Sequence, residues 1–388
     1  MPSISAKRER RDDSVLDARR VSLVLDAHAN VPNPLEQATR ETTIDAGTPI
    51  ELERLRRGGV GAVVLAANVV RGPRTPMGIA ADRTIVEAKL AAIKDISRCN
   101  PQKAAIALSA DDVERIAAGG RTALILALIG AHTLGVDISA IRRLHHEGLR
   151  VFGMVHTGNN AFVDSSRPYG NEPANEHGGL SDLGRQAVAE ANRVGLLLDV
   201  SQFSTAAVLQ TVKLSRAPVV ASHSAVRALV DNPRNLTNEE LAVIADAGGV
   251  VGIVAFSLYL KNLTPAELEA RRQITDRYGG MRNGYEGLSI ESRQAYYREL
   301  AAVTSRATLD DYIKVIDYAV DRIGIDHVAL SSDFNQGGGI DGWADGSQAP
   351  NVTVALLKRG YTASEVHKLW GANFLRVLRA AQAMASAE

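Results

Sequence analysis

Short apolar runs alternate with longer amphipathic stretches along this chain. The runs lie at 21–27, 60–67, 123–129, 149–155, 196–200, 218–221, 250–255 and 328–330. They are rich in Val, Ile and Leu without polar alternation, which is typical of strands buried on both faces of a parallel sheet. Helical stretches lie between them, and two of these follow the capping residues Thr237 and Thr308. Eight strands with intervening helices predict an α/β fold, a (β/α)₈ TIM barrel.

The interval 258–307, between strands 7 and 8 of this pattern, is too long for an ordinary loop. Pro265 opens one helical stretch in it and 289–302 forms another, so we predict a helical insertion. An open doubly wound sheet is the alternative fold. It would place a glycine-rich phosphate loop after an early strand, and the sequence has none. We therefore predict one barrel domain over 1–388, with a flexible terminus at 1–20.

Charge and composition restrict the partners of this chain. Lys plus Arg and Asp plus Glu both number 44, so the net charge is zero and no overall field attracts nucleic acid or an anionic membrane. No apolar run is long enough to span a membrane, and residues 1–20 are too polar for a signal peptide, so we expect a cytoplasmic protein. The single cysteine, Cys99, excludes an internal disulfide and a thiolate metal cluster. A small-molecule substrate is the expected partner.

Polar residues follow nearly every predicted strand at its carboxyl end, where barrel enzymes have their active sites. The histidines at these ends and one aspartate form the candidate set: His28, His132, His156, His223 and Asp333. A single histidine at a strand end is more often structural than functional. Four of them on one rim together with an aspartate predict a site, because chance would scatter polar residues over both ends of the barrel.

Motifs in a fixed order between about residue 21 and residue 381 resemble a known family. They include Gly-Leu-Ser-Asp-Leu-Gly-Arg at 179–185, Pro-Val-Val-Ala-Ser-His-Ser at 218–224, Asn-Pro-Arg-Asn-Leu at 232–236 and Trp-Gly-Ala-Asn-Phe-Leu-Arg-Val at 370–377. These motifs are similar to those of bacterial members of the membrane (renal) dipeptidase family. That family consists of metallohydrolase barrels that cleave dipeptides and related small amides with two zinc ions. The resemblance also implies a homodimer.

The positions that the resemblance assigns to zinc ligands are only partly retained. His28 and His223 keep the imidazole, but Asn30 stands where the family has an aspartate and Gln202 where it has a histidine. Ile129 replaces the glutamate that bridges the two ions. Paired cations need an anionic bridge, and neutral amides are poor zinc ligands. We therefore expect no cofactor, with one weakly bound zinc ion as the upper limit.

The substrate contacts that the resemblance implies are better retained. His156 corresponds to the substrate-contacting histidine, Arg234 to the arginine that grips the substrate carboxylate, and Asp333 to the aspartate near the metals and the substrate amine. We assign substrate binding to the following set: Arg234, His28, His132, Asn30 and Gln202. General acid and base roles are assigned to His156, His223 and Asp333.

Three functions are compatible with these residues. The sequence favours a dipeptidase-like barrel that carries out metal-independent acid–base chemistry on a small metabolite with a carboxylate or amide group. The first alternative is a dipeptidase or amidohydrolase that uses a single divalent metal held by His28, His223 and Asp333. The second is a non-catalytic relative that binds a ligand. Metal analysis of the purified protein distinguishes the first two.

Overall fold

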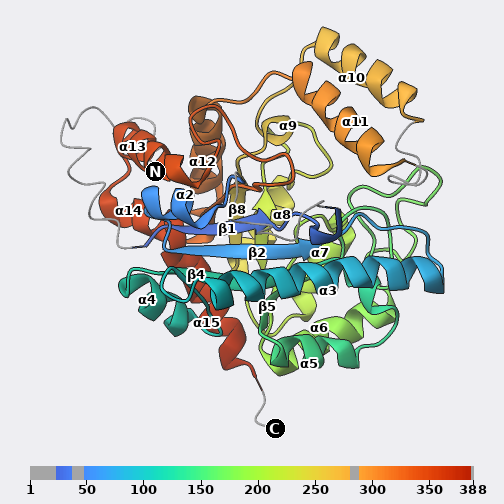
Figure 1. The fold of residues 1–388 in the computed structure, drawn as a ribbon, viewed down its shortest axis with the longest axis horizontal. Helices are drawn as coiled ribbons and strands as arrows, with labels where there is room; N and C mark the ends of the chain where they lie inside the picture. Colours follow the sequence, from blue (N-terminus) through green and yellow to red (C-terminus); the bar gives the residue numbers. More distant parts are fainter. Residues whose placement is uncertain (1–22, 37–47, 280–287, 386–388) are drawn as a thin grey trace.

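A parallel barrel surrounded by helices makes up most of the computed structural model, which describes residues 23–36, 48–279 and 288–385 (Figure 1). Its strands, in spatial order, are β1 (Leu25–Asn30), β2 (Ala62–Asn68), β4 (Thr122–Ile129), β5 (Leu149–Gly153), β6 (Leu197–Asp199), β7 (Val220–Ser224), β8 (Val250–Val254) and β9 (Val328–Ser331). Two backbone hydrogen bonds of 2.9 Å, from Asp333 to His28 and from Asn30 to Phe334, connect the end of β9 to β1. The predicted (β/α)₈ barrel is confirmed.

Two strands differ from the sequence prediction. The first apolar run covers residues 21–27, whereas β1 spans Leu25–Asn30 and includes the polar rim residues, and Ala29 and Asn30 pair with Leu65 and Ala66 of β2. A short strand, β3 (Ala104–Ile106), also pairs with the start of β4, and its three residues are too few to give a pattern of their own.

Helices cover the outside of the barrel (Figure 1). They are α2 (Leu52–Arg57), α3 (Pro76–Cys99), α4 (Ala110–Ala118), α5 (Ser139–His146), α6 (Asp182–Val194), α7 (Thr205–Leu214), α8 (Asn238–Asp246), α12 (Leu309–Ile323), α13 (Ala349–Arg359), α14 (Ala363–His367) and α15 (Asn373–Ala383). The predicted starts at Thr237 and Thr308 are confirmed, since both residues form capping boxes with an acidic residue three positions later. None of the described helices is long and apolar enough to cross a membrane.

Side chains of each strand alternate between two apolar cores. In β4, Leu124, Leu126 and Leu128 pack outward against the helices, whereas Ile125 and Ile129 belong to the core inside the barrel. Ile129 is the last residue of β4, so it lies at the end of the inner core that borders the carboxyl ends of the strands. Packed side chains occupy the interior of such barrels, and the polar site lies beyond this inner core, at the carboxyl ends of the strands.

The predicted insertion between the last two strands is helical. It contains α9 (Ser257–Leu260), α10 (Pro265–Arg277) and α11 (Ile290–Ala302), whose bounds agree closely with the sequence prediction. Ile274, Tyr296 and Leu300 form a small apolar core between α10 and α11. In Figure 1 this helix pair projects from the upper right of the barrel. The predicted flexible terminus at 1–20 lies outside the described residues.

Gly252 in β8 is a sensitive point of the barrel wall. A Cβ atom there would lie 2.1 Å from the backbone oxygen of Ser222 in β7. Backbone cannot move aside as a side chain does, so we expect Gly252→Ala to lower the free energy of unfolding by about 2–3 kcal/mol. Chemical denaturation measures this loss. Gly61→Ala is the control, since its nearest contacts are side-chain atoms at 3.1 Å. Equal stability of the two variants would contradict the expectation.

Candidate functional site

Two stacked histidine rings form the centre of the rim at the carboxyl ends of the strands. His28 of β1 and His223 of β7 have ring centroids 3.7 Å apart and an interplanar angle of 19°. Burial lowers the pKa of His28 to about 4. Burial also lowers the pKa of His223 well below its usual value, and the neighbouring His28 acts in the same direction. Both imidazoles are therefore neutral near pH 7.

The hydroxyl of Ser222 orients both rings. Oγ of Ser222 donates to Oδ2 of Asp199 at 2.5 Å, so it accepts from Nδ1 of His28 at 3.1 Å and from Nδ1 of His223 at 2.8 Å. The proton of each imidazole is thus on Nδ1, and each Nε2 carries a lone pair. A histidine that binds a metal through one ring nitrogen usually donates its other N–H toward a carboxylate, and here Ser222 connects both Nδ1–H groups to Asp199.

A buried nitrogen without a partner lies beside a carboxylate. Nε2 of His28 makes no hydrogen bond to any described residue, and Oδ1 of Asp333 is 3.9 Å away. Burial raises the pKa of Asp333 to about 7, and the hydrogen bond from Asn30 opposes this rise. Asp333 follows β9 with a φ of 53°, a left-handed conformation that turns its side chain toward β1.

An amide network surrounds this carboxylate. Nδ2 of Asn30 donates to Oδ1 of Asp333 at 2.6 Å, and Oδ1 of Asn30 accepts from Nδ2 of Asn68 at 2.6 Å. Asn68, the last residue of β2, also exchanges hydrogen bonds with Gln336 and accepts from Nζ of Lys89 at 3.2 Å. Two aspartates at positions 30 and 333 would repel each other at this distance. Asn30 removes that repulsion without a cation.

His156 lies at the edge of the same network. Its Nε2 is 3.3 Å from Oε1 of Gln336 and its Nδ1 is 3.2 Å from Oγ1 of Thr157. Burial, followed by repulsion from Arg167, lowers its pKa well below the usual value. The structure therefore connects His156 to the predicted site through Gln336 and leaves its predicted acid–base role as a prediction.

The side-chain amide of Gln202 lies between His223 and the guanidinium of Arg167. It follows β6 with a φ of 72°, and its Nε2 is 3.0 Å from Nε2 of His223. Its Oε1 accepts from Nη2 of Arg167 at 3.5 Å. Gln202 thus contacts His223 and presents a hydrogen-bond donor where a metal ligand is expected from the resemblance, and its role in substrate binding stays a prediction.

Arg234 is a buried cation with unused donors. Its side chain is 2% exposed, Nη2 donates to the backbone oxygen of His223 at 2.8 Å, and its guanidinium carbon lies 5.3 Å from the ring centre of Tyr259. Nε and Nη1 have no hydrogen-bond partner among the described residues. Burying a charged group with unpaired N–H donors costs free energy unless an anion accepts those hydrogen bonds. The two free donors of Arg234 therefore indicate an anion-binding position.

Two predicted site residues have other surroundings. Ile129 is buried in the inner core and pairs in register with Gly153 of β5, so an apolar side chain takes the place of a bridging carboxylate. His132 lies in the turn Ala131–Leu134, and its Nε2 is 3.4 Å from Oδ2 of Asp82 in α3. Asp82 is the carboxylate beside this nitrogen, which makes no hydrogen bond to any described residue, and the role of His132 in substrate binding stays a prediction.

Sequence reasoning missed several residues of the site: Asn68, Lys89, Arg167, Ser222 and Gln336. Asn68 had the same signal as the other polar strand ends and was overlooked. Lys89 had a signal as well, because it falls on the buried stripe of α3 with Val86, Leu90 and Ile93. Arg167 lies in a long irregular segment between β5 and α6, where no periodicity marks its direction.

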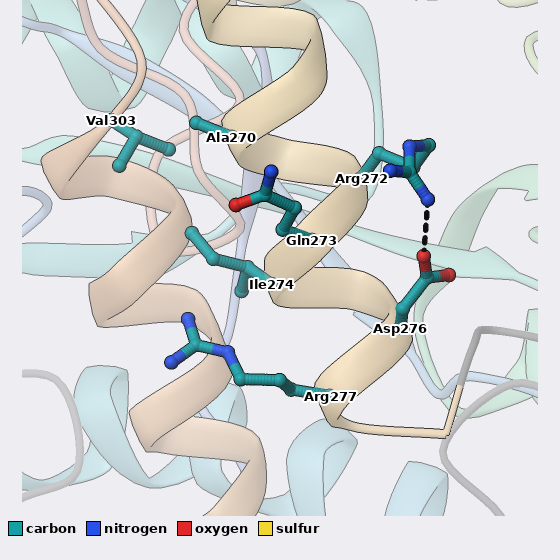
Figure 2. A pocket seen from close by; sticks show the side chains of 7 residues that line it. All are labelled: Ala270, Arg272, Gln273, Ile274, Asp276, Arg277 and Val303. Atoms are coloured by element: carbon teal, nitrogen blue, oxygen red, sulfur yellow. Dashed lines mark hydrogen bonds and ion pairs between the residues drawn. The ribbon is translucent and has the colours of Figure 1, made fainter.

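A hollow on the helical insertion is separate from this site. It has a volume of about 710 Å³ and is lined by Ala270, Arg272, Gln273, Ile274, Asp276, Arg277 and Val303. Figure 2 shows six of these side chains along α10, Val303 on the neighbouring segment after α11, and the ion pair between Arg272 and Asp276, which is 2.7 Å long. None of the predicted site residues lines it, and it contains no group of converging polar side chains. We therefore assign no chemistry to it.

The residues present fit one divalent ion better than two. Ligand atoms of His28, Asp199 and His223 lie within 4.8 Å of one another. Both oxygens of Asp199, however, already accept hydrogen bonds from Ser222 and Ser201. The unpartnered Nε2 of His28 and the nearby Asp333 make the opposite side of the rings the better place for an ion. A second ion would lack a bridging anion, because Ile129 stands there.

Comparisons with known proteins identify the family. A model of the membrane dipeptidase family (peptidase family M19) matches residues 14–388. Dipeptidase tcpJ from Claviceps purpurea is 28% identical over 354 residues, which cover 90% of this chain and 73% of that protein. Dipeptidase aclJ from Aspergillus oryzae is 32% identical over 260 residues, which cover 67% of this chain and 51% of that protein.

Solved structures show the same barrel. The probable dipeptidase PvdM from Pseudomonas aeruginosa superimposes with a TM-score of 0.87 at 35% identity, over 97% of this chain and 100% of that one. A metallo peptidase from Rhodobacter sphaeroides, liganded with a phosphinate mimic of the dipeptide L-Ala-D-Ala, superimposes with a TM-score of 0.74 over 92% of this chain and 99% of that one. Its identity of 23% supports the fold alone.

The expectation that this chain uses no cofactor is wrong. The matched family consists of metallopeptidases that need zinc, and the structure brings His28, Asp199 and His223 together as a potential metal cluster. Three of the family's ligand positions are replaced, but the two retained imidazoles of His28 and His223 still lie together. Neither the described residues nor the comparisons support metal-independent chemistry or a non-catalytic relative.

Proposed function

The chain belongs to the membrane dipeptidase family, peptidase family M19, and on this premise we propose that it is a hydrolase of small dipeptide-like amides that uses one zinc ion. The observation that carries the proposal is the unpartnered, buried Nε2 of His28, which is stacked against His223 and adjacent to Asp333. A buried imidazole nitrogen without a partner costs free energy unless something binds it. A divalent cation is the ligand that suits a lone pair beside a carboxylate.

His28, His223 and Asp333 are the residues that would hold the ion. The Asp199–Ser222 pair holds Nδ1 of both imidazoles and leaves Nε2 of His28 without a partner. Nε2 of His223 accepts from Gln202 and would exchange that hydrogen bond for the ion, and Oδ1 of Asp333 would complete a three-ligand set typical of catalytic zinc. When bound, zinc supplies Lewis-acid polarisation of the scissile carbonyl. We therefore assign His223 to metal binding rather than to acid–base catalysis.

Asp333 and Arg234 act on the reactants directly. Oδ2 of Asp333, the carboxylate next to the two imidazoles, accepts the proton that the attacking water loses. The proton then passes to the leaving amine. Arg234 binds the substrate carboxylate with the N–H groups that have no protein partner, and so places the amide bond near the two imidazoles.

Metal analysis together with dipeptide hydrolysis tests this function. We expect the purified chain to contain about one zinc per molecule and to cleave dipeptides with a free carboxylate. A chelator should abolish the activity and added zinc should restore it. A matched dipeptide amide, which lacks the anionic end, is the control and should be a poor substrate. Two zinc ions per chain, or no cleavage of any dipeptide by the zinc-loaded protein, would refute the proposal.

A further inference from the structure

Arg167 is a second guanidinium of the rim, and its N–H groups are poorly satisfied. It lies in the segment between β5 and α6, and its Nη2 donates to Oε1 of Gln202 over a long distance of 3.5 Å. A guanidinium that is paired with an anion makes shorter hydrogen bonds, of about 2.7–2.9 Å. Nε of Arg167 is buried and has no hydrogen-bond partner among the described residues. Burying such a donor costs free energy, so Arg167, like Arg234, indicates a position for an anion.

Hydrogen bonds attach the backbone of this segment to the rim. The backbone N–H of Ser166 donates to the backbone oxygen of Gln202 at 2.9 Å. The backbone N–H of Arg167 donates to Oγ of Ser165 at 3.0 Å, and the backbone oxygen of Arg167 accepts from the N–H of Gly158 at 2.9 Å. Gly158 follows β5 and Gln202 follows β6, so the segment is joined to the ends of both strands. The side chain of Arg167 therefore starts from a fixed point, which specific recognition requires.

Arg167 and Arg234 lie at the same part of the site. Arg234 donates to the backbone oxygen of His223 at 2.8 Å, and Arg167 contacts Gln202, whose Nε2 is 3.0 Å from the ring of His223. Burial lowers the pKa of Arg234, and the positive charge of Arg167 acts in the same direction. Two like charges this close repel each other, so negative charge from a ligand stabilises the pair.

The carboxylates of the rim already have other partners. Asp199 accepts three hydrogen bonds from neighbouring serines, and Oδ1 of Asp333 accepts one from Asn30. One substrate carboxylate has two oxygens, and the two unpartnered nitrogens of Arg234 are sufficient to bind them. Nε of Arg167 would still have no acceptor. A second anionic group on the substrate would supply it.

We propose that the substrate is a dipeptide whose C-terminal residue carries a second carboxylate, and that Arg167 is the specificity-determining residue that binds this group. Arg234 holds the main-chain carboxylate of the same residue. The side-chain carboxylate of an Asp or Glu residue reaches Arg167, because both guanidiniums are connected to His223, one through its backbone and the other through Gln202. The inference rests on the proposed dipeptide hydrolysis and names the substrate class of that site.

Kinetics with a matched pair of dipeptides test this inference. Ala-Glu and Ala-Gln have nearly the same shape and differ in the charge of the C-terminal side chain. We expect kcat/KM of the zinc-loaded wild type to be about 10–30-fold higher for Ala-Glu, mainly through KM, because a charged hydrogen-bonded pair forms with this substrate alone. Equal kcat/KM for the two dipeptides would overturn the inference and leave the proposed function intact.

Variants of Arg167 assign the preference to this side chain. Arg167→Met should remove most of the preference, with the loss of kcat/KM concentrated on Ala-Glu. Arg167→Lys should recover part of it, since an ammonium keeps the charge but not the planar arrangement of donors. Arg74→Met is the matched control, because it removes a partly exposed guanidinium paired with Glu176 and should keep the wild-type preference. If Arg167→Met does not fold, Arg167→Gln gives the same comparison with a neutral polar side chain.

The remaining outcomes separate the inference from its alternatives. An equal loss on Ala-Glu and Ala-Gln in Arg167→Met would show that the two guanidiniums share one carboxylate, which overturns the inference. A preference for Glu-Ala over Gln-Ala that depends on Arg167 would place the second anion on the N-terminal residue and would also overturn it. Failure to cleave any dipeptide would refute the proposed function instead. Calorimetric titration of the full chain with Ala-Glu and Ala-Gln then measures the preference without hydrolysis, and equal affinities would overturn the inference as well.

Discussion

A His223→Ala variant is expected to lose its bound zinc and at least about 10³-fold in kcat for dipeptide hydrolysis. The variant removes one of only two imidazole ligands, and Asp333 with His28 cannot hold the ion alone. Lewis-acid activation contributes several kcal/mol to the transition state, and each 1.4 kcal/mol corresponds to about tenfold in rate. Zinc content after gel filtration and kcat are measured on the same preparation.

Two controls accompany this variant. His146→Ala removes an exposed histidine at the end of α5 and should change neither zinc content nor rate. Because the ring of His223 stacks on His28, the thermal unfolding of His223→Ala is compared with that of the wild type to exclude a folding defect. A folded variant that retains stoichiometric zinc would place the ion away from the two stacked rings.

An Arg234→Met variant is expected to lower kcat/KM for dipeptides by about 10²–10³-fold, mainly through KM. Removing one partner of a buried, hydrogen-bonded charge pair costs about 2–5 kcal/mol. Here the partner is the substrate carboxylate, which the free Nε and Nη1 of Arg234 are positioned to bind. Arg234→Lys should recover part of the loss, since an ammonium keeps the charge but not the planar arrangement of donors.

Changing the substrate instead of the protein tests the same contact. A dipeptide amide lacks the carboxylate, so the wild type should lose a comparable factor against it, whereas Arg234→Met should barely distinguish the two substrates. Arg306→Met, which removes a half-exposed arginine paired with Asp341, is the matched control. If the variant discriminated against the amide as strongly as the wild type, Arg234 would not be the carboxylate site.

The barrel could be predicted from sequence because its strands are buried on both faces. Such strands leave uninterrupted apolar runs, and seven of the eight predicted runs lie within two residues of the observed strand starts. β1 was the exception, since the apolar run begins at residue 21 whereas β1 begins at Leu25 and carries the polar residues Asp26, His28 and Asn30 at alternate positions. A strand that carries the site does not look like a strand that fills the core.

The chemistry of the site was only half visible in the sequence. The retained His28, His223 and Asp333 marked the rim, but the sequence showed the replaced ligands as losses and led to the wrong expectation of no cofactor. The structure shows that His28 still presents a free Nε2 toward Asp333. The residue type shows which side-chain atoms can bind a metal or form a hydrogen bond, but it does not show which of these atoms already have a partner in the fold.

The sequence by itself therefore determined the barrel, the end at which the site lies and most of the polar residues on it. Only the tertiary structure decided which partner each nitrogen of the two stacked histidines has and which way each amide faces. The physical reason is that hydrogen-bond direction depends on partners far away in the chain. Asn30 and Asp333 are 303 residues apart, and Asp199 reaches the rings of His28 and His223 only through Ser222. No local pattern encodes such contacts, because they exist only after the barrel closes.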